Sequence, residues 1–225
     1  PVSFGILHLG PALPDFMLRH PELKVDIEFT DRFVDLIEEG FDLGIRITKL
    51  DDSGMIARKL SDFRVYACAT PAFIAENGPL THPSELSRIP FLIDTNSRSH
   101  NSLRFLDTDG DMISVSVTGP IEVNSPLATL RAARAGMGIA MIPDFIARPY
   151  IASGELISLF DDFIPKDRGI YAVYPHRRYL PAKVRAFVDW AADLFAKHPQ
   201  LKAASEELKK IMLTYGGVSG ARDNL

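Results

Sequence analysis

Cysteine and long hydrophobic runs are nearly absent from this 225-residue chain. Cys68 is the single cysteine, so no disulfide framework can form within the chain, which fits a reducing cytoplasmic environment. No run of about 18 apolar residues occurs, and this argues against a membrane-spanning helix. We find no signal peptide, and because the sequence starts at Pro1 and not at Met, we expect a fragment of a longer protein.

An excess of positive charge is missing as well. Lys and Arg number 25 against 29 Asp and Glu, which gives a net charge of −4. Nucleic-acid binding rests on basic patches that displace counterions from phosphates, so this chain alone is a poor candidate for it. Hydrophobic residues make up 46% of the chain, a share typical of globular proteins. The length allows one large domain or two of about 100 residues.

Short strand and helix patterns alternate along the chain. Residues 24–29 alternate between apolar and polar and predict a half-buried strand, after which Asp31 is placed to cap a helix that Gly40 ends. Further strands are expected over 42–47, 55–60, 63–69, 119–123, 139–142, 156–160 and 170–174, a hairpin over 103–117, and helices over 71–77, 126–135, from 143, over 181–195 and over 201–213. This order predicts an α/β fold with a parallel sheet.

Catalytic constellations are scarce. The six histidines are scattered and form no His-Glu-x-x-His motif, so we expect neither a metal site nor a cofactor. Cys68 lies in an apolar strand pattern and has two interpretations. A small buried thiol is the simpler one, since a nucleophile would need a nearby histidine and a helix N-terminus.

Features typical of ligand binding are better represented. Asn124-Ser125-Pro126 opens a helix after a strand, where unpaired N–H groups and the helix dipole favour an anion, although ordinary capping explains the same residues. Ser3-Phe4-Gly5 has a similar pattern. Arg46 lies on the polar face of its strand, where it would either bind an anionic ligand or pair with a local acid such as Asp42 or Asp31.

Nine motifs follow one another in a fixed order. They are Phe-Met-Leu-Arg-His-Pro at 16–21, Val-Asp-Ile-Glu at 25–28, Asp-Leu-Ile-Glu-Glu-Gly-Phe-Asp-Leu-Gly-Ile-Arg at 35–46, Ala-Cys-Ala-Thr-Pro-Ala-Phe at 67–73, Val-Asn-Ser at 123–125, Ala-Gly-Met-Gly-Ile-Ala-Met-Ile-Pro at 135–143, Ser-Gly-Glu-Leu at 153–156, Val-Tyr-Pro-His-Arg at 173–177 and Leu-Pro-Ala-Lys-Val-Arg-Ala-Phe at 180–187. With these motifs, residues 1–198 resemble the effector-binding domain of LysR-type transcriptional regulators.

The resemblance implies a two-lobed α/β fold like that of type 2 periplasmic binding proteins, with two crossover strands. Lobe I would comprise residues 1–68 and 174–198, lobe II residues 69–173, and residues 199–225 would form a C-terminal helix and tail extension. A small-molecule effector would bind in the cleft between the lobes. The residues that the resemblance places there are Ser3, Thr30 and Arg46 from lobe I, and Thr95, Asn124, Ser125 and Pro143 from lobe II. These hydroxyl, amide and guanidinium groups favour a small anion.

The resemblance also implies a homodimer of this domain and a homotetramer of the full-length regulator. The helix-turn-helix domain that binds DNA in this family, and the strand that normally ends just before Ser3, lie outside the sequence. One alternative is a solute-binding receptor of a transporter with the same fold. Another is an enzyme on this scaffold, with Asp31, Asp94 and His100 as the acid–base candidates.

Overall fold

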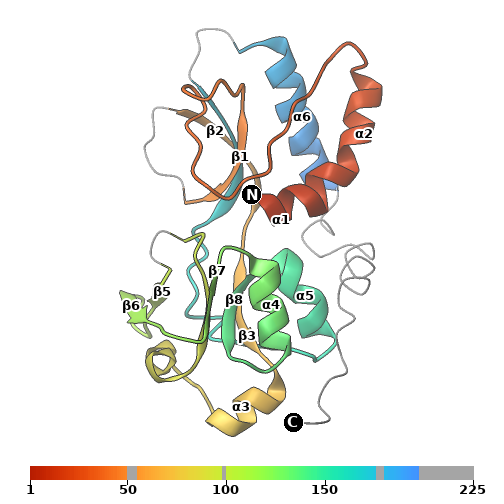
Figure 1. Ribbon diagram of the computed structural model, residues 1–225. Helices are drawn as coiled ribbons and strands as arrows, with labels where there is room; N and C mark the ends of the chain where they lie inside the picture. Colours follow the sequence, from red (N-terminus) through yellow and green to blue (C-terminus); the bar gives the residue numbers. More distant parts are fainter. Residues whose placement is uncertain (50–54, 98–99, 176–179, 198–225) are drawn as a thin grey trace.

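Two lobes, one above the other in Figure 1, make up the computed structural model, which describes residues 1–49, 55–97, 100–175 and 180–197. The upper lobe, lobe I, holds a three-stranded sheet in the order β1-β10-β2. The lower lobe, lobe II, holds a five-stranded sheet in the order β7-β4-β8-β3-β9, with the two-stranded β5-β6 sheet beside it. Among the described residues, no helix is long and apolar enough to span a bilayer.

Lobe I combines antiparallel strands with long helices. Its elements are α1 (Val2–Phe4), the π-helical turn η1 (Gly5–Leu9), α2 (Gly10–Arg19), β1 (Gly44–Thr48), β2 (Met55–Asp62), β10 (Gly169–Pro175) and α6 (Ala182–Lys197). One face of α6 is buried, and its Phe187 and Trp190 rings lie 5.2 and 5.1 Å from the ring of Phe16 on α2. Ring packing therefore holds α6 against α2.

Lobe II contains the parallel part of the fold. Its elements are β3 (Val65–Ala69), α3 (Pro71–Asn77), the 3₁₀-helix η2 (Pro83–Arg88), β4 (Phe91–Asp94), β5 (Ser102–Leu106), β6 (Met112–Ser116), β7 (Ile121–Val123), α4 (Pro126–Arg134), β8 (Ile139–Pro143), α5 (Asp144–Ala152) and β9 (Ile157–Leu159). Strand β4 runs parallel to both β7 and β8, whereas β3 runs antiparallel to β8 and β9. The parallel sheet that the sequence predicts is thus limited to three strands.

The chain passes between the two sheets twice. The first passage lies between β2 and β3, and the second between β9 and β10, because β3 pairs only within the lobe II sheet and β10 pairs with β1 and β2. The two passages are joined by a hydrogen bond of 3.2 Å from the Phe63 N–H to the Arg168 carbonyl. A continuous core joins the lobes as well, with Phe4 and Phe195 of lobe I in the same buried cluster as Phe145 of lobe II.

Two local predictions in lobe I are wrong. Val25 and Phe29 are half-buried, yet residues 24–29 form no strand, because no described strand hydrogen-bonds to them. The Phe29 ring packs instead on η1, so close to Gly5 that a Cβ added there would lie 2.4 Å from the ring. The pattern therefore reports packing against a helix and not membership of a sheet.

The helix predicted between Asp31 and Gly40 is also replaced by a turn. Its amides at Ile37 and Glu38 donate to the Asp35 carboxylate, and Gly40 ends the turn with a φ of +78°. Strong local side-chain acceptors compete with helical hydrogen bonds, which explains the shorter element. The helix and tail predicted over residues 199–225 lie outside the described residues.

Candidate functional site

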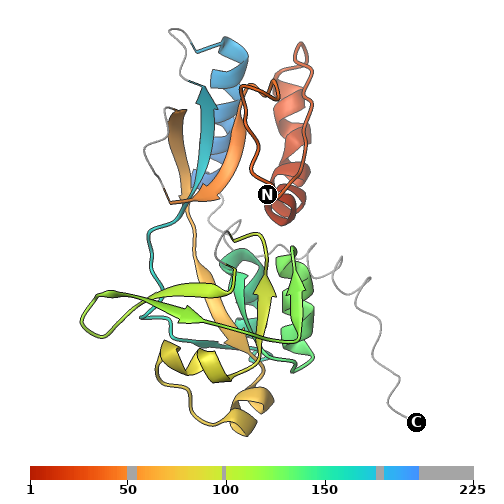
Figure 2. The same cartoon turned by 60° about the vertical axis from the view of Figure 1, so that its left-hand side comes forward.

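Three parallel strands end at one edge of the lobe II sheet, and this edge faces lobe I (Figure 2). Asp94 at the end of β4 is in register with Val123 at the end of β7, and the amide of the next residue, Thr95, donates to the Val123 carbonyl at 3.0 Å. Asn124 and Ser125 follow β7 directly, and β8 ends at the same edge. The structure therefore places the four lobe II residues of the predicted site along one edge: Thr95, Asn124, Ser125 and Pro143.

Ser125 caps helix α4, as the capping interpretation predicted. Its hydroxyl accepts a hydrogen bond of 3.4 Å from the Ala128 N–H, and Pro126 occupies the first helical turn, where its missing N–H costs nothing. At this helix end, the Leu127 amide donates neither to Ser125 nor to any helical carbonyl of the described residues. The end of α4 thus keeps one free N–H group and the positive end of the helix dipole.

Helix α5 offers less to a ligand. Pro143 precedes its first turn, and the following amide, that of Asp144, already donates to the Arg64 carbonyl at 3.0 Å. The Asp144 carboxylate is buried and pairs with Arg148 at 3.1 Å, while burial raises its pKa. This helix end carries negative charge already, so Pro143 marks the position of the site without supplying a donor.

Two of the three residues predicted in lobe I, Ser3 and Thr30, lie at the lower end of that lobe. The Val2 amide donates to the Asp31 carboxylate at 2.9 Å, which brings the start of α1, with Ser3, next to Thr30 and Asp31. Ser3 is only 7% exposed, and none of the described residues hydrogen-bonds to its hydroxyl. The Thr30 hydroxyl accepts from the Arg32 amide at 3.4 Å.

Arg46 takes part in a local structure instead of an ion pair. Its guanidinium donates to the Val34 carbonyl at 2.6 Å and lies over the Phe33 ring, 4.4 Å from the ring centre. The predicted pairing with Asp42 or Asp31 is wrong, since Asp42 binds Lys183 and Asp31 binds the Val2 amide. Partial burial lowers the pKa of Arg46, and the charge of Asp35 opposes this shift.

Asp94 at the end of β4 has a perturbed carboxyl group. Burial at the end of β4 raises the pKa of Asp94, and the negative charge of Asp31 raises it further, while a hydrogen bond of 3.0 Å from the Asn96 amide acts against both. Asp31 belongs to lobe I and Asp94 to lobe II. The third residue of the enzyme alternative, His100, is half-buried at the start of the hairpin region.

Sequence reasoning missed His8 as a feature of this region. Its side chain is 1% exposed, and neither ring nitrogen has a hydrogen-bond partner among the described residues. Burial lowers its pKa to about 4, so the ring is neutral at physiological pH. A lone histidine between Leu7 and Leu9 carries no pattern that distinguishes it from an exposed one. Its ring packs against Phe4 of its own lobe and Phe145 of lobe II.

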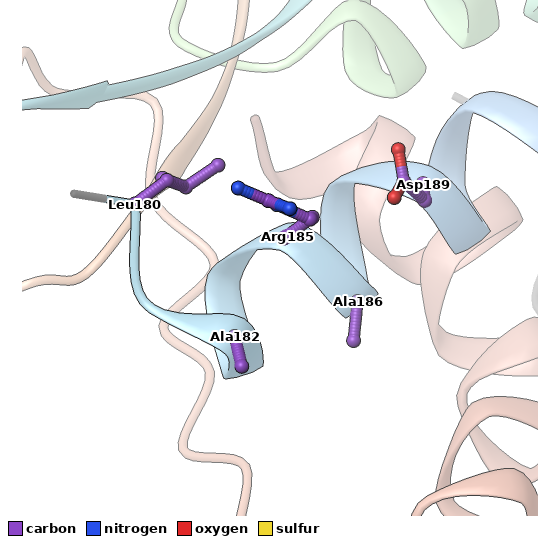
Figure 3. Close-up of a pocket in the computed structure, with 5 residues that line it drawn as sticks. All are labelled: Leu180, Ala182, Arg185, Ala186 and Asp189. Atoms are coloured by element: carbon purple, nitrogen blue, oxygen red, sulfur yellow. The ribbon is translucent and has the colours of Figure 1, made fainter.

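A surface cavity of about 340 Å³ lies on α6 and not between the lobes (Figure 3). Its lining residues are Leu180, Ala182, Arg185, Ala186 and Asp189. Asp189 also pairs with Arg58 of β2. None of the seven predicted binding residues lines this cavity, and it combines a single acid with a single base over small apolar side chains.

Chemistry at a metal ion or a thiolate finds no support in the described residues. No group of three or more His, Cys, Asp or Glu side chains in that part of the chain is placed to hold a metal ion. Cys68 is fully buried in β3, and burial raises the pKa of its thiol to about 12. A thiol with this pKa stays protonated and is a poor nucleophile.

Comparison with known proteins identifies the fold and the family. The family model described as LysR substrate binding domain matches residues 1–196. The chain belongs to the LysR substrate-binding domain family. Among curated proteins, this LysR domain is 35% identical over 188 residues to an uncharacterized HTH-type transcriptional regulator of Haemophilus influenzae, covering 82% of this chain and 64% of that protein. It is 33% identical over 198 residues to the HTH-type transcriptional regulator DmlR of Escherichia coli K12, covering 87% and 64%.

Solved structures confirm the predicted two-lobed α/β fold of the LysR domain. The structure of CrgA, a LysR-type transcriptional regulator from Neisseria meningitidis, matches with a TM-score of 0.70 at 26% identity, covering 85% of this chain and 65% of that chain. The full-length structure of AphB, a virulence activator of Vibrio cholerae, matches in fold with a TM-score of 0.70 at 23% identity, covering 84% and 64%.

The LysR domain spans under two thirds of the length of the first of these regulators. The relatives are named as transcriptional regulators, which favours a regulatory role over the transport receptor and the enzyme that the sequence left open. The substrate-binding description of the family fits the ligand-sensing role expected from the sequence.

Proposed function

We propose that this chain is the effector-sensing domain of a DNA-binding LysR-type regulator and that it binds a small anionic metabolite between the lobes. The observation that carries the proposal is the meeting of three parallel strand ends with the N-terminus of α4 at the edge that faces lobe I. Open α/β sheets usually bind ligands at the carboxyl ends of their strands, and helix N-termini attract anions.

The proposal gives the residues at this edge different roles. The Leu127 amide and the hydroxyls of Thr95 and Ser125 would hold the anionic group, with the Asn124 amide at the rim. From lobe I, the unpaired hydroxyl of Ser3 and that of Thr30 would complete the contacts. Pro143 would shape the wall. Arg46 would have to exchange its bond to the Val34 carbonyl for the ligand, so its role is the one that the local contacts support least.

The proposal extends to the whole regulator as well. The two lobes expected from the sequence would bind the ligand between them, with their boundaries moved by a few residues, because β3 pairs in the lobe II sheet and β10 in the lobe I sheet. Residues 199–225 would be an extension. The domain would form a homodimer within a homotetramer in the cytoplasm and reach DNA only through a helix-turn-helix domain outside this sequence. No cofactor is needed, since ligand binding shifts the population of lobe or subunit arrangements by its differential affinity.

A thermal-shift screen against several hundred metabolites, rich in small carboxylates, tests the proposal. A ligand at about 100 times its dissociation constant adds roughly 2.7 kcal/mol to the free energy of unfolding, which is well within detection. We expect hits among anions and weaker binding after Ser125→Asp, which retains a capping oxygen but adds a negative charge. Hits only among neutral compounds would contradict the anionic effector and retain the sensor. No hit in the whole library would count against the sensor.

A further inference from the structure

His8 is a buried polar group at the contact between the lobes. Its side chain is 1% exposed, and neither ring nitrogen has a hydrogen-bond partner among the described residues. A neutral imidazole carries one N–H donor and one acceptor nitrogen, and leaving both without partners away from water costs free energy. Water would supply both hydrogen bonds if the lobes moved apart. The buried ring therefore favours separation of the lobes, against the packing that holds them together.

Rings from both lobes enclose His8. The ring of Phe145, near the start of α5 in lobe II, lies 5.0 Å from the His8 ring at an angle of 81°, and Phe4 of α1 lies 5.1 Å from it. Figure 1 shows α1 at the lower end of lobe I, above α5. Phe145 also lies 6.4 Å from Phe63, which belongs to the first passage between the lobes. The imidazole is thus packed next to the segment that connects the lobes.

The connection between the lobes allows a change in their angle. The chain passes between the two sheets twice, and one hydrogen bond, from the Phe63 N–H to the Arg168 carbonyl, joins the two passages. Two-lobed folds of this kind turn through a few backbone dihedral angles in such passages. The buried rings, with His8 among them, form the contact that has to break when the lobes of this structure move from a closed to an open arrangement.

Within the described ranges, no charge compensates a proton on His8. The helical run over residues 2–9 carries no other ionisable side chain. The charged groups beside the packed rings are Asp144 and Arg148 of α5, which pair with each other at 3.1 Å, and the exposed Asp193 of α6. Burial is the cause that lowers the pKa of His8 to about 4, and none of these charges contributes.

We propose that His8 is an acid-sensitive latch between the lobes, which holds them closed while its imidazole is neutral and releases them when it takes up a proton. A charge within the ring contact would be costly, whereas a hydrated charge on an open lobe would not be. Acid would therefore shift the population from closed to open lobes. The inference goes beyond the proposed function, because it holds whatever the effector is.

Two protonation equilibria set the direction and the range of the effect. The hydrated ring of an open lobe would keep the ordinary histidine pKa of 6.5, and the closed arrangement lowers this pKa to about 4. Above pH 6.5 the ring is neutral in both arrangements, so pH does not change their ratio. Between about pH 6.5 and about pH 4, each unit of acidification should raise the ratio of open to closed lobes by up to about tenfold.

Single-molecule energy transfer between the lobes tests the inference in this chain. Leu18→Cys on α2, 83% exposed, and Asp109→Cys in the exposed hairpin turn would carry a pair of dyes whose emission does not depend on pH. Cys68 is fully buried and stays unlabelled in the folded chain. We expect a second population of interdye distances to appear and grow between pH 7 and pH 4.5, while far-ultraviolet circular dichroism keeps its native signal.

Histidine variants then assign the sensor. His8→Phe keeps a ring without titration, and His8→Gln keeps a neutral polar side chain if the larger ring does not fit. Both should retain one distance population over the whole pH range, although Asp144 still titrates in them. His20→Phe is the matched control, since His20 contacts Phe16 within lobe I. It should respond to acid like the unchanged chain.

Three outcomes would overturn the latch, and each leaves the proposed effector binding untouched. One is a single distance population from pH 7 to pH 4.5. Another is a second population that appears to the same extent in His8→Phe and His8→Gln, because a different group would then be the sensor. The third is a loss of circular dichroism in step with the second population, which would assign the effect to unfolding of the whole chain.

Discussion

The His8 ring of lobe I lies edge-to-face against the Phe145 ring of lobe II, with ring centres 5.0 Å apart and an angle of 81° between the planes. Phe4 contacts both rings, at 5.1 Å from His8 and 5.8 Å from Phe145, and stacks on Phe195 of α6. This aromatic cluster joins the first helix, α5 and α6. The angle between the lobes therefore depends on the packing of a few rings.

Acid should weaken this contact. Burial lowers the pKa of His8 from 6.5 to about 4, so the unfolded chain takes up the proton more readily than the folded one. The free energy of unfolding should fall as the pH drops from about 6.5 to about 4, by roughly 3 kcal/mol in total, and this contribution should then level off. Urea denaturation at several pH values measures it.

His8→Phe is the matched control for the acid effect, because it keeps an aromatic ring and removes the titration. The difference between the two stability curves isolates His8 from Asp94 and Asp144, whose raised pKa values act in the opposite direction. A difference that stays constant between pH 7 and pH 4 would contradict a buried neutral His8.

Phe145→Ala should be among the most destabilising substitutions in the chain. The ring is 3% exposed and contacts Phe4, His8 and Phe63, so its loss leaves a cavity between the lobes. We expect a loss of about 3–5 kcal/mol in the free energy of unfolding. Leu18→Ala, at a side chain that is 83% exposed, should change it by less than about 0.5 kcal/mol. Equal effects of the two would show that the cluster is not packed.

Gly5 of η1 and Gly10 of α2 should respond in opposite ways to alanine. At Gly5 a Cβ would lie 2.4 Å from the Phe29 ring, so Gly5→Ala should cost about 1–3 kcal/mol. At Gly10 it would meet only a carbonyl at 3.5 Å, and Gly10→Ala should add roughly 0.5–1 kcal/mol through helix propensity. Both have helical φ, −60° and −53°, so backbone strain does not enter the comparison. Thermal denaturation of both variants checks the sign.

Ser125→Ala should cost about 0.5–2 kcal/mol of stability, because the Ala128 amide loses its side-chain acceptor and keeps only the Ser125 carbonyl. Ser125→Asn should restore most of this loss, since its side-chain oxygen accepts the same bond. If α4 holds the anionic end of the effector, Ser125→Asp should keep stability and weaken binding. Unchanged affinity in that variant would move the anion away from α4.

Arg46→Ala separates two roles of the guanidinium. The loss of the bond to Val34 and of the contact with Phe33 should lower stability by about 1–3 kcal/mol. A direct bond to the effector would add a loss of roughly 1.5–3 kcal/mol in binding free energy, as measured by calorimetry. A stability loss without an affinity loss would assign Arg46 to holding the loop and remove it from the proposed site.

Local signals predicted the elements of lobe II well. Thr70 before Pro71 and Ser125 before Pro126 are caps, and both helices start where the sequence places them, because a cap and a proline act within a single turn. The hairpin turns at Gly110 with a φ of +85°, as an Asp-Gly turn predicts. Such features need no distant partner.

Elements that depend on distant partners were predicted less well. Residues 24–29 carry the same alternation as a strand, but a strand exists only where a neighbouring backbone pairs with it. The polar face of β1 left Arg46 either to bind an anion or to pair with a local acid, but the turn at Val34 supplies an acceptor that no local pattern reveals. The sequence also predicted a parallel sheet, whereas the lobe I sheet is antiparallel, because strand direction depends on how distant segments pair.

The sequence by itself determined the class of the fold, the positions of α3 and α6, the cap of α4 and, through its ordered motifs, the family. These properties follow from short-range spacing and from hydrophobic periodicity. The tertiary structure alone decided which polar groups meet between the lobes and which rings hold the lobes together. Asp31 and Asp94 are 63 positions apart, as the numbering shows. The effect of the Asp31 charge on the pKa of Asp94 and the burial of His8 arise only when the chain brings distant segments together.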